Sequence, residues 1–288
     1  MSVFVASIGF GLVAAAVLAL AAVGFTLQFA VTNVLNLAYG GVMIVSAYAA
    51  YALNHAGVNI WIATLASIVV GALVSLFLNN VVYTPFKRKG TSPIAMVIVS
   101  LGMTLILVFG TQALAGPTNV SYSMSQGSLI KLGSIELTVV QLVIIALSIV
   151  VMGLVHVLIR YSRLGKAMRA TAANRDLARN CGIRTDRVVM ATWVISGALC
   201  GLAGATFAIN SGTFGATSTD VFLVLILAAV FLGGPGEPYG AMLGALVIGL
   251  ATEVSASIVV SDYKDVIAFV ILLGMLAVRP NGLLGAPA

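Results

Sequence analysis

The side chains in this sequence that are best suited to binding chemistry are cations gathered in one stretch. Residues 163–187 read RLGKAMRATAANRDLARNCGIRTDR and hold nine of the 22 charged residues in the 288-residue chain; seven of the nine are basic. Three roles are open for this cluster. It can be a signal that keeps its loop in the cytoplasm, an attachment to anionic lipid headgroups, or a docking element for a soluble partner.

The same stretch carries signals of local helical order. Asn174 is a good N-cap, Asp176 would lie in the first turn of the following helix, and Arg179 near its end. Gly182 stands where a left-handed residue would close that helix. A mildly apolar stripe at helical spacing precedes it, formed by Leu164, Ala167, Met168 and Thr171. We expect two short helices joined by an elbow, an order that favours docking over a plain topology signal.

A second set of polar side chains lies in an otherwise apolar segment, residues 24–41, GFTLQFAVTNVLNLAYGG. On a continuous helix, Gln28, Thr32 and Asn36 would share one face, with Asn33 close by. Unpaired amides are costly against lipid, so these side chains should point into the helix bundle or into a wet cavity. Two interpretations stay open: a path for a polar solute, or hydrogen bonds that hold the helices together.

Catalytic chemistry has little support in the sequence. His55 and His156 have no carboxylate or cysteine near them along the chain. Neither the H-E-x-x-H zinc motif nor the G-x-x-x-x-G-K-[ST] phosphate loop occurs. We therefore expect no catalytic residue, no metal site and no cofactor on this chain.

The elements that must position these residues are membrane helices. Charged residues make up 8% of the chain, against about 25% in a soluble domain, and residues 1–86 contain none. Apolar windows of the roughly 20 residues that a spanning helix needs recur throughout, without the alternation of a β-barrel. We expect an all-α polytopic membrane protein that forms a single transmembrane domain over residues 1–288. Its apolar spans are expected at 3–25, 36–54, 58–82, 92–114, 137–159, 189–209, 219–234, 240–259 and 264–278.

The charge between the spans predicts their orientation. Basic residues gather at 87–89, 160–187 and 279, and the other connections are poor in Lys and Arg. With the basic loops in the cytoplasm, nine crossings put the N-terminus outside and the C-terminus in the cytoplasm. A break within residues 24–40 would instead give eight full spans and a re-entrant piece. The net charge of +6 then marks cytoplasmic loops, and nucleic acid is not an expected partner.

Four segments in order resemble the permease subunits of branched-chain amino acid ABC importers, on the LivH-type branch. GKAMRATAANRDLARNCGI, followed by ATWVISGALCGLAGA, is similar to that family's G-x-A-x-R-A, A-x-x-x-G-I and A-G-x-A-G pattern. VLNLAYGG resembles its N-F-A-H-G segment, and LGGPGEPYGAMLGALVIG its glycine turn and following helix. DVIAFVILLGMLAVRPNGLLG resembles its C-terminal ending. The resemblance covers nearly the whole chain.

The resemblance implies an ATP-driven importer in a bacterial inner membrane. Two cytoplasmic ABC ATPases would bind ATP and Mg²⁺, and a second, LivM-like permease and an extracytoplasmic solute-binding protein would complete it. Residues 160–188 would be the cytoplasmic coupling loop. Its contacts with the ATPases would come from Gly165, Lys166, Ala167, Arg169, Ala170, Arg179 and Gly182. The translocation pathway would be lined by Gln28, Thr32, Asn33, Asn36 and Tyr39.

The sequence departs from the family pattern in places that leave the solute open. Leu37 and Tyr39 stand where the family has Phe and His, and Glu237 where it has Ser in the glycine turn. Branched-chain amino acids are the default solute, with other small polar or amphipathic solutes as alternatives. The rival function is a stand-alone ion-coupled carrier or channel. Such a carrier would usually use a buried carboxylate, and the first 86 residues contain no carboxylate.

Overall fold

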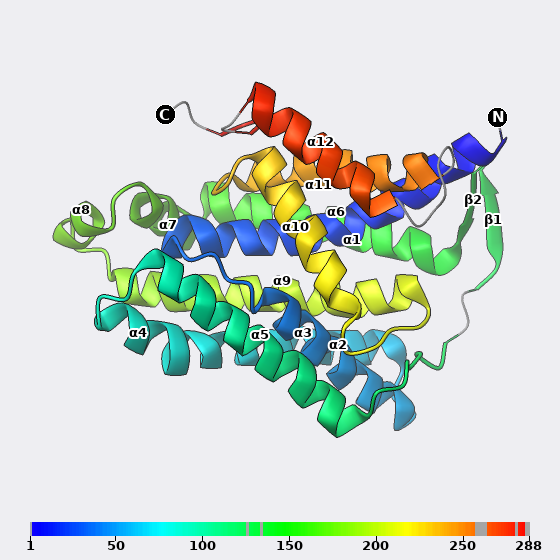
Figure 1. Cartoon of the computed structure of the whole chain (residues 1–288), viewed down its shortest axis with the longest axis horizontal. Helices are drawn as coiled ribbons and strands as arrows, with labels where there is room; N and C mark the ends of the chain where they lie inside the picture. The colour runs from blue at the N-terminus through cyan, green and yellow to red at the C-terminus, as the bar shows by residue number, and fades with distance from the viewer. Residues whose placement is uncertain (1, 125–126, 133–134, 257–263, 280–281, 286–288) are drawn as a thin grey trace. The chain divides into compact units, whose positions relative to one another are not determined.

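The computed structural model describes residues 2–124, 127–132, 135–256, 264–279 and 282–285, and these are almost entirely helical (Figure 1). Among them, six helices are long and apolar enough to cross a membrane. The predicted class, an all-α polytopic membrane protein, is confirmed. The elements are α1 Ser2–Thr32, α2 Tyr39–His55, α3 Ile60–Phe77, the π-helix η1 Leu78–Tyr83, α4 Thr84–Arg88, α5 Pro93–Ala115, β1 Leu129–Leu132, β2 Ile135–Thr138, α6 Val139–Tyr161, α7 Arg163–Ala173, α8 Arg175–Asn180, α9 Thr185–Ser211, α10 Ser218–Gly233, α11 Pro238–Ala256 and α12 Lys264–Val278.

Each of the nine expected spans contains one helix, but α2, in the expected span 36–54, is not among the six helices that are long and apolar enough to cross a membrane. Helix α10 and the apolar part of α12, Val266–Ala277, are shorter than a full span, so the count of nine crossings stays a prediction. The N-terminal break is narrower than expected. Helix α1 continues past Gly24 to Thr32, and only residues 33–38 are non-helical before α2 begins.

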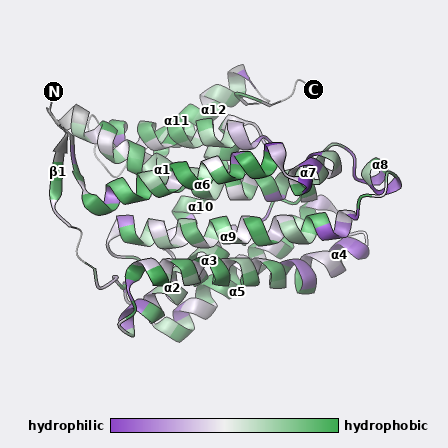
Figure 2. Cartoon of the chain, turned by 180° about the vertical axis from the view of Figure 1, so that it is seen from behind, coloured by the Kyte–Doolittle hydropathy of each residue, from purple (hydrophilic) through white to green (hydrophobic). Residues whose placement is uncertain are grey.

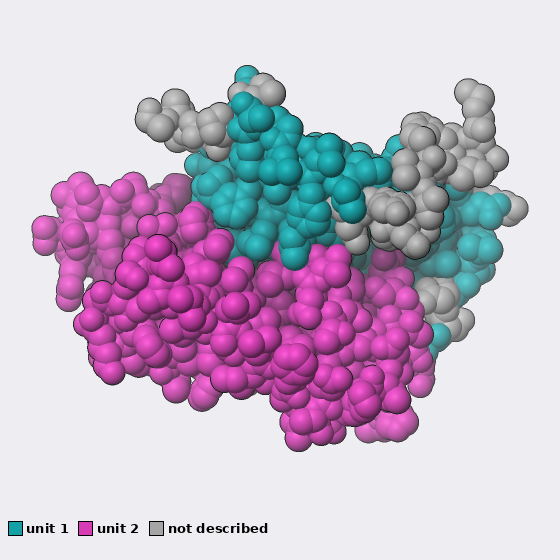
Figure 3. Space-filling view, in the orientation of Figure 1, with its two compact units in different colours: residues 1–26, 124–151, 224–288 teal, residues 27–123, 152–223 magenta. Residues whose placement is uncertain are grey.

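The chain divides into two compact units (Figure 3). One unit comprises residues 1–26, 124–151 and 224–288, and the other comprises residues 27–123 and 152–223. The expected single domain over residues 1–288 stays a prediction, and the two units are described separately.

The first unit is built on close contacts between small residues. A Cβ atom added to Gly249 of α11 would overlap the backbone of Ala15 in α1, and one on Gly244 would overlap the Ala229 carbonyl of α10. Gly244 and Gly249 therefore serve helix packing, since small residues let helix backbones approach closely in membranes. Strands β1 and β2 form an antiparallel hairpin in which Leu129 is opposite Thr138.

The second unit is organised around the packing of α3 against α9. Gly71 of α3 faces Gly197 and Gly201 of α9 so closely that a Cβ atom on any of them would overlap the other helix's backbone. Ser75 donates a hydrogen bond across the same contact to the Trp193 carbonyl oxygen at 2.9 Å. Figure 2 shows hydrophobic residues along the helix shafts and hydrophilic residues concentrated on α7, α8 and the end of α4.

Candidate functional site

The site begins where α1 ends. Asn33 has a φ angle of 52°, in the left-handed region, and its N–H donates to the Phe29 carbonyl oxygen at 2.8 Å. This is the single hydrogen bond of the αL helix ending, in which Asn is the common substitute for Gly. Lys87 Nζ donates to the Thr32 carbonyl oxygen at 2.9 Å, so a cation lies at the negative end of the helix dipole. Together these contacts end α1 inside the second unit.

The irregular backbone after α1 is held by a side chain of α5. The N–H of Leu37 donates to Ser100 Oγ at 3.2 Å, and the Ser100 hydroxyl lies 3.3 Å from the Leu35 carbonyl oxygen. Non-helical backbone at membrane depth is tolerated where protein groups take the place of water. Ser100 supplies such a group, because it both accepts from and approaches the broken segment.

A buried polar network connects the break to two other helices. Gln28 Oε1 accepts hydrogen bonds from Asn36 Nδ2 at 3.4 Å and from Ser196 Oγ at 3.1 Å. Tyr83 donates to Asn36 Oδ1 at 2.5 Å. The Gln28 and Asn36 side chains are each 1% exposed. Among the described residues Gln28 Nε2 has no hydrogen-bond partner, so one buried donor remains for a further ligand or a water molecule.

Tyr39 joins the same region from the first turn of α2. Its hydroxyl donates to the Ser196 carbonyl oxygen at 3.3 Å, and Cys200 Sγ donates to the Tyr39 carbonyl oxygen at 3.2 Å. Thr219, in the first turn of α10, donates to the Gly40 carbonyl oxygen at 3.1 Å. The start of α2 is thereby fixed to both α9 and α10.

Four of the five predicted pathway residues are buried in this region: Gln28, Thr32, Asn36 and Tyr39. Asn33 is not, because its side chain is exposed and its backbone closes α1. The prediction that Gln28, Thr32 and Asn36 share one face of a continuous helix was wrong. Asn36 lies beyond the end of α1, and reaches Gln28 because the chain folds back.

Sequence reasoning missed Tyr83 and Ser100, which contact the break, and Ser196, which contacts Gln28 beside it. Tyr83 lies in η1, where Thr84 N–H donates to the Asn79 carbonyl oxygen five residues back. Pro85 follows, and its missing N–H cannot continue the ordinary four-residue pattern. Pro85, two residues after Tyr83 in an apolar span, was the sequence signal for an irregular helical turn. Such π-turns often occur at functional sites.

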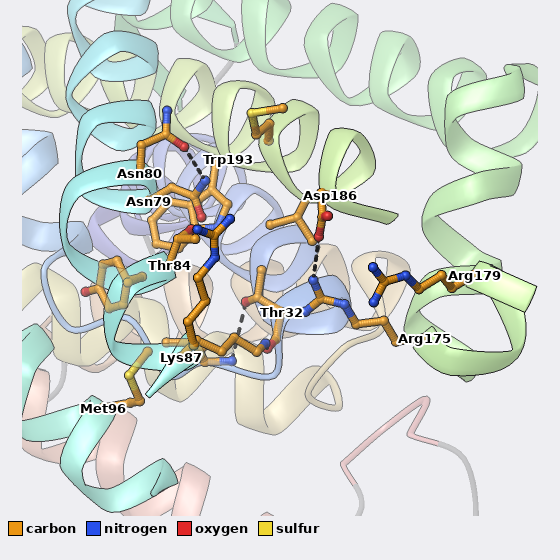
Figure 4. Close-up of a pocket in the computed structure, with 15 residues that line it drawn as sticks. Thr32, Asn79, Asn80, Thr84, Lys87, Met96, Arg175, Arg179, Asp186 and Trp193 are labelled. Carbon is orange, nitrogen blue, oxygen red and sulfur yellow. Dashed lines mark hydrogen bonds and ion pairs between the residues drawn. The ribbon is translucent and has the colours of Figure 1, made fainter. Parts of the chain in front are cut away.

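A cavity of about 490 Å³ lies next to the network in the same unit (Figure 4). Thr32, Tyr83 and Trp193 form part of its wall, and the Tyr83 and Trp193 rings are 4.9 Å apart. Its remaining lining includes four basic side chains, Lys87, Arg88, Arg175 and Arg179, with the carboxylate of Asp186. The cavity therefore connects the basic stretch of the sequence with the polar break.

The basic stretch folds as the sequence predicts. Asn174 Oδ1 accepts from the Leu177 N–H at 2.9 Å and caps α8. Gly182 has a φ angle of 85° and closes α8 with two backbone bonds, Gly182 N–H to the Arg179 carbonyl and Ile183 N–H to the Ala178 carbonyl, both 3.0 Å. These are the two bonds of the Schellman motif. The two short helices and their elbow are confirmed.

The seven predicted coupling residues differ in their surroundings. Lys166, Arg169, Arg179 and Gly182 are exposed, and Ala167 and Ala170 are half-buried. Gly165 is buried, and a Cβ atom there would overlap the carbonyl groups of Leu158 and Ile159. The turn from α6 into α7 therefore requires glycine at position 165. Arg169 donates to the Ile159 carbonyl oxygen at the same turn.

Helix α8 is also attached to α9. Arg175 pairs with Asp186 at 3.1 Å across the connection. Leu177, on α8, has a large apolar side chain that is 60% exposed. Arg179 on the same helix is exposed as well, so α8 presents an apolar side chain beside a cation.

Neither histidine takes part in this site. The His55 ring stacks on Tyr51 at 5.7 Å, and the His156 ring lies 6.2 Å from Tyr161. Within the described ranges, no three His, Cys, Asp or Glu side chains are grouped as a metal ion would require. The absence of catalytic and metal sites stays a prediction.

Comparisons with known proteins match this chain along nearly its full length. The family model described as "Branched-chain amino acid transport system / permease component" matches residues 7–276. The high-affinity branched-chain amino acid transport system permease protein LivH of Salmonella typhimurium is 30% identical over 284 residues, which cover 93% of this chain and 91% of the relative. The probable LivH permease of Methanocaldococcus jannaschii is 28% identical, with 93% and 88% covered.

A more distant relative transports another kind of solute. The ribose import permease protein RbsC of Escherichia coli is 24% identical over 270 residues, which cover 90% of this chain and 81% of the relative. No solved structure matches the chain.

Proposed function

The chain belongs to the family of branched-chain amino acid transport permease components, and we propose that it is the pore-forming subunit of an ATP-driven importer whose ATPases are separate proteins. The chain is a multi-pass membrane permease, and the family resemblance stated from its sequence is confirmed. The family gives no support to a stand-alone carrier.

One observation carries the coupling part of the proposal: helix α9 contacts both the proposed docking segment, which is α7 and α8 (residues 163–180), and the polar side chains around the break at residues 33–38. Near its start, Asp186 pairs with Arg175 of α8. Ten residues further along, Ser196 donates to Gln28 in the buried network. Because a helix transmits displacement along its axis, a push on α8 would be carried to the residues around Asn36.

The proposed pathway is lined by buried residues in the break and at the helix ends on either side of it. Gln28, Thr32, Asn36 and Tyr39 converge there, and Gln28 Nε2 is a buried donor without a partner among the described residues. Such a donor can bind the carboxylate of an amino acid. We propose a branched-chain amino acid as the solute, in keeping with the printed names of the relatives.

The rest of the assembly is proposed from the family alone. Two ABC ATPases, which would hold ATP and Mg²⁺, would dock on α7 and α8. A second, LivM-like permease and an extracytoplasmic solute-binding protein would complete the importer in a bacterial inner membrane, with the C-terminus in the cytoplasm. The basic residues at 87–89 and 160–187 support this orientation.

Co-purification tests the docking role. Tagged protein is isolated in mild detergent from its native cell, and the retained ATPases are quantified. We expect Leu177→Asp to reduce the ATPase yield about tenfold, because a charge would replace an exposed apolar contact. The matched control is Leu129→Asp on the β1–β2 hairpin, where the leucine is 61% exposed. Equal ATPase yields from the two variants would contradict docking on α8.

A further inference from the structure

The cavity between α4, α8 and α9 is lined by four basic side chains, and the carboxylate of Asp186 balances the charge of one of them. Among the described residues that line it, Asp186 is the one carboxylate, and it pairs with Arg175 at 3.1 Å. Lys87 donates to a neutral group, the Thr32 carbonyl oxygen. Within the described part of the chain, Arg88 and Arg179 form no ion pair.

The helix dipole explains the position of Arg179, in the last turn of α8, but not that of Arg175. Arg175 is its first residue, where a positive charge opposes the helix dipole. Arg175 and Arg179 are four residues apart, and like charges at this spacing destabilise a helix. Figure 4 shows both side chains extending from α8 on the same side, toward Asp186. A bound anion would remove this repulsion.

The neutral part of the lining fits an oxygen-rich ligand. Asn79, Asn80 and Thr84 contribute amide and hydroxyl groups beside the cations. The Asn79 side chain is buried and donates to Asn80 Oδ1 at 3.0 Å. A single carboxylate would meet far more positive charge than it carries. A phosphate group has more acceptor oxygens and matches the fork of an arginine.

We propose that this cavity binds a phosphate group, supplied by an anionic lipid headgroup or by free phosphate. Basic pockets between membrane helices bind lipid headgroups in this manner. Arg88 comes from α4, and Arg179 comes from α8. One phosphate contacting both would bridge the end of the α3–α4 span to the docking segment. The effect of that bridge on coupling depends on the proposed transport function, but the binding itself does not.

The test uses the full-length protein in nanodiscs of phosphatidylcholine, alone or with phosphatidylglycerol, at constant ionic strength set with KCl. Melting temperature and ligand affinity are measured, the latter for inorganic phosphate and, by native mass spectrometry, for phosphatidylglycerol. The variant is Arg88→Gln/Arg179→Gln. The control is Lys89→Gln/Arg163→Gln, which removes the same charge from exposed residues outside the cavity.

We expect one or both phosphate sources to raise the melting temperature of the wild type and of the control. The cavity variant should bind at least about tenfold more weakly, since each lost charged hydrogen bond costs roughly that factor. A response to phosphatidylglycerol alone assigns a lipid headgroup, and one to inorganic phosphate alone assigns a soluble ligand. If the wild type binds neither, or if both double variants weaken binding equally, the phosphate site is wrong. Circular dichroism verifies that the variants are folded.

Discussion

Tyr83 donates a hydrogen bond to Asn36 at 2.5 Å, although 47 positions separate them along the chain. Asn36 Nδ2 in turn donates to Gln28. The amide of Asn36 is therefore oriented from both sides, with its oxygen toward η1 and its nitrogen toward α1. This orientation links the π-helical turn before α4 to the break that precedes α2.

Replacing Tyr83 with Phe should leave Asn36 Oδ1 buried without its donor. A buried acceptor that loses its partner costs about 1–3 kcal/mol. We expect a lower melting temperature in detergent and a changed solute affinity in a reconstituted uptake assay. Tyr51→Phe is the control, because Tyr51 stacks on His55 outside the network. Unchanged values for Tyr83→Phe would show that this hydroxyl has no role.

Asn36→Leu and Asn33→Leu should have different effects. Asn36 is 1% exposed and hydrogen-bonded, so Leu should alter the solute affinity or the maximal rate of uptake. Asn33 is exposed with a φ angle of 52°, so Leu should cost about 1 kcal/mol of stability through backbone strain without changing solute affinity. Asn33→Gly should restore the stability. A shift in affinity for Asn33→Leu alone would reverse these assignments.

Substitution with a larger side chain should distinguish the structural role of Gly165 from the proposed coupling role of Ala170. Gly165→Val would place methyl groups against the Leu158 and Ile159 carbonyls, and we expect too little folded protein to purify. Ala170 is half-buried on α7, and Ala170→Trp should fold while its solute-stimulated ATP hydrolysis falls. Normal stimulated hydrolysis in Ala170→Trp would contradict a role for this face in coupling.

The Arg175–Asp186 pair should contribute little stability by itself. Its side chains are 37% and 79% exposed, and exposed pairs are worth about 0.2–1 kcal/mol. A double-mutant cycle with Arg175→Ala and Asp186→Ala should give a coupling energy in that range that falls as salt is added. A coupling energy well above this range that is insensitive to salt would indicate a buried, rigid link.

Local features of the sequence were sufficient to predict the two short helices within residues 163–180. The Asn174 cap and the Gly182 ending each depend on residues within a few positions of one another, and both were predicted correctly. The network around Asn36 was predicted only in part, because Tyr83, Ser100 and Ser196 reach it from distant segments. Apolar periodicity places spans along the chain, but it does not say which polar side chain of one helix faces a given residue of another.

The break after α1 also sets an order for assembly during synthesis. Within the break, Leu37 is hydrogen-bonded to Ser100 of α5, and Asn36 is linked through Gln28 to Ser196 of α9. A ribosome that has made only the first two helices has not yet made either serine. The N-terminal part of the permease must therefore stay unfinished in the bilayer, or sheltered by the insertion machinery, until α9 has emerged.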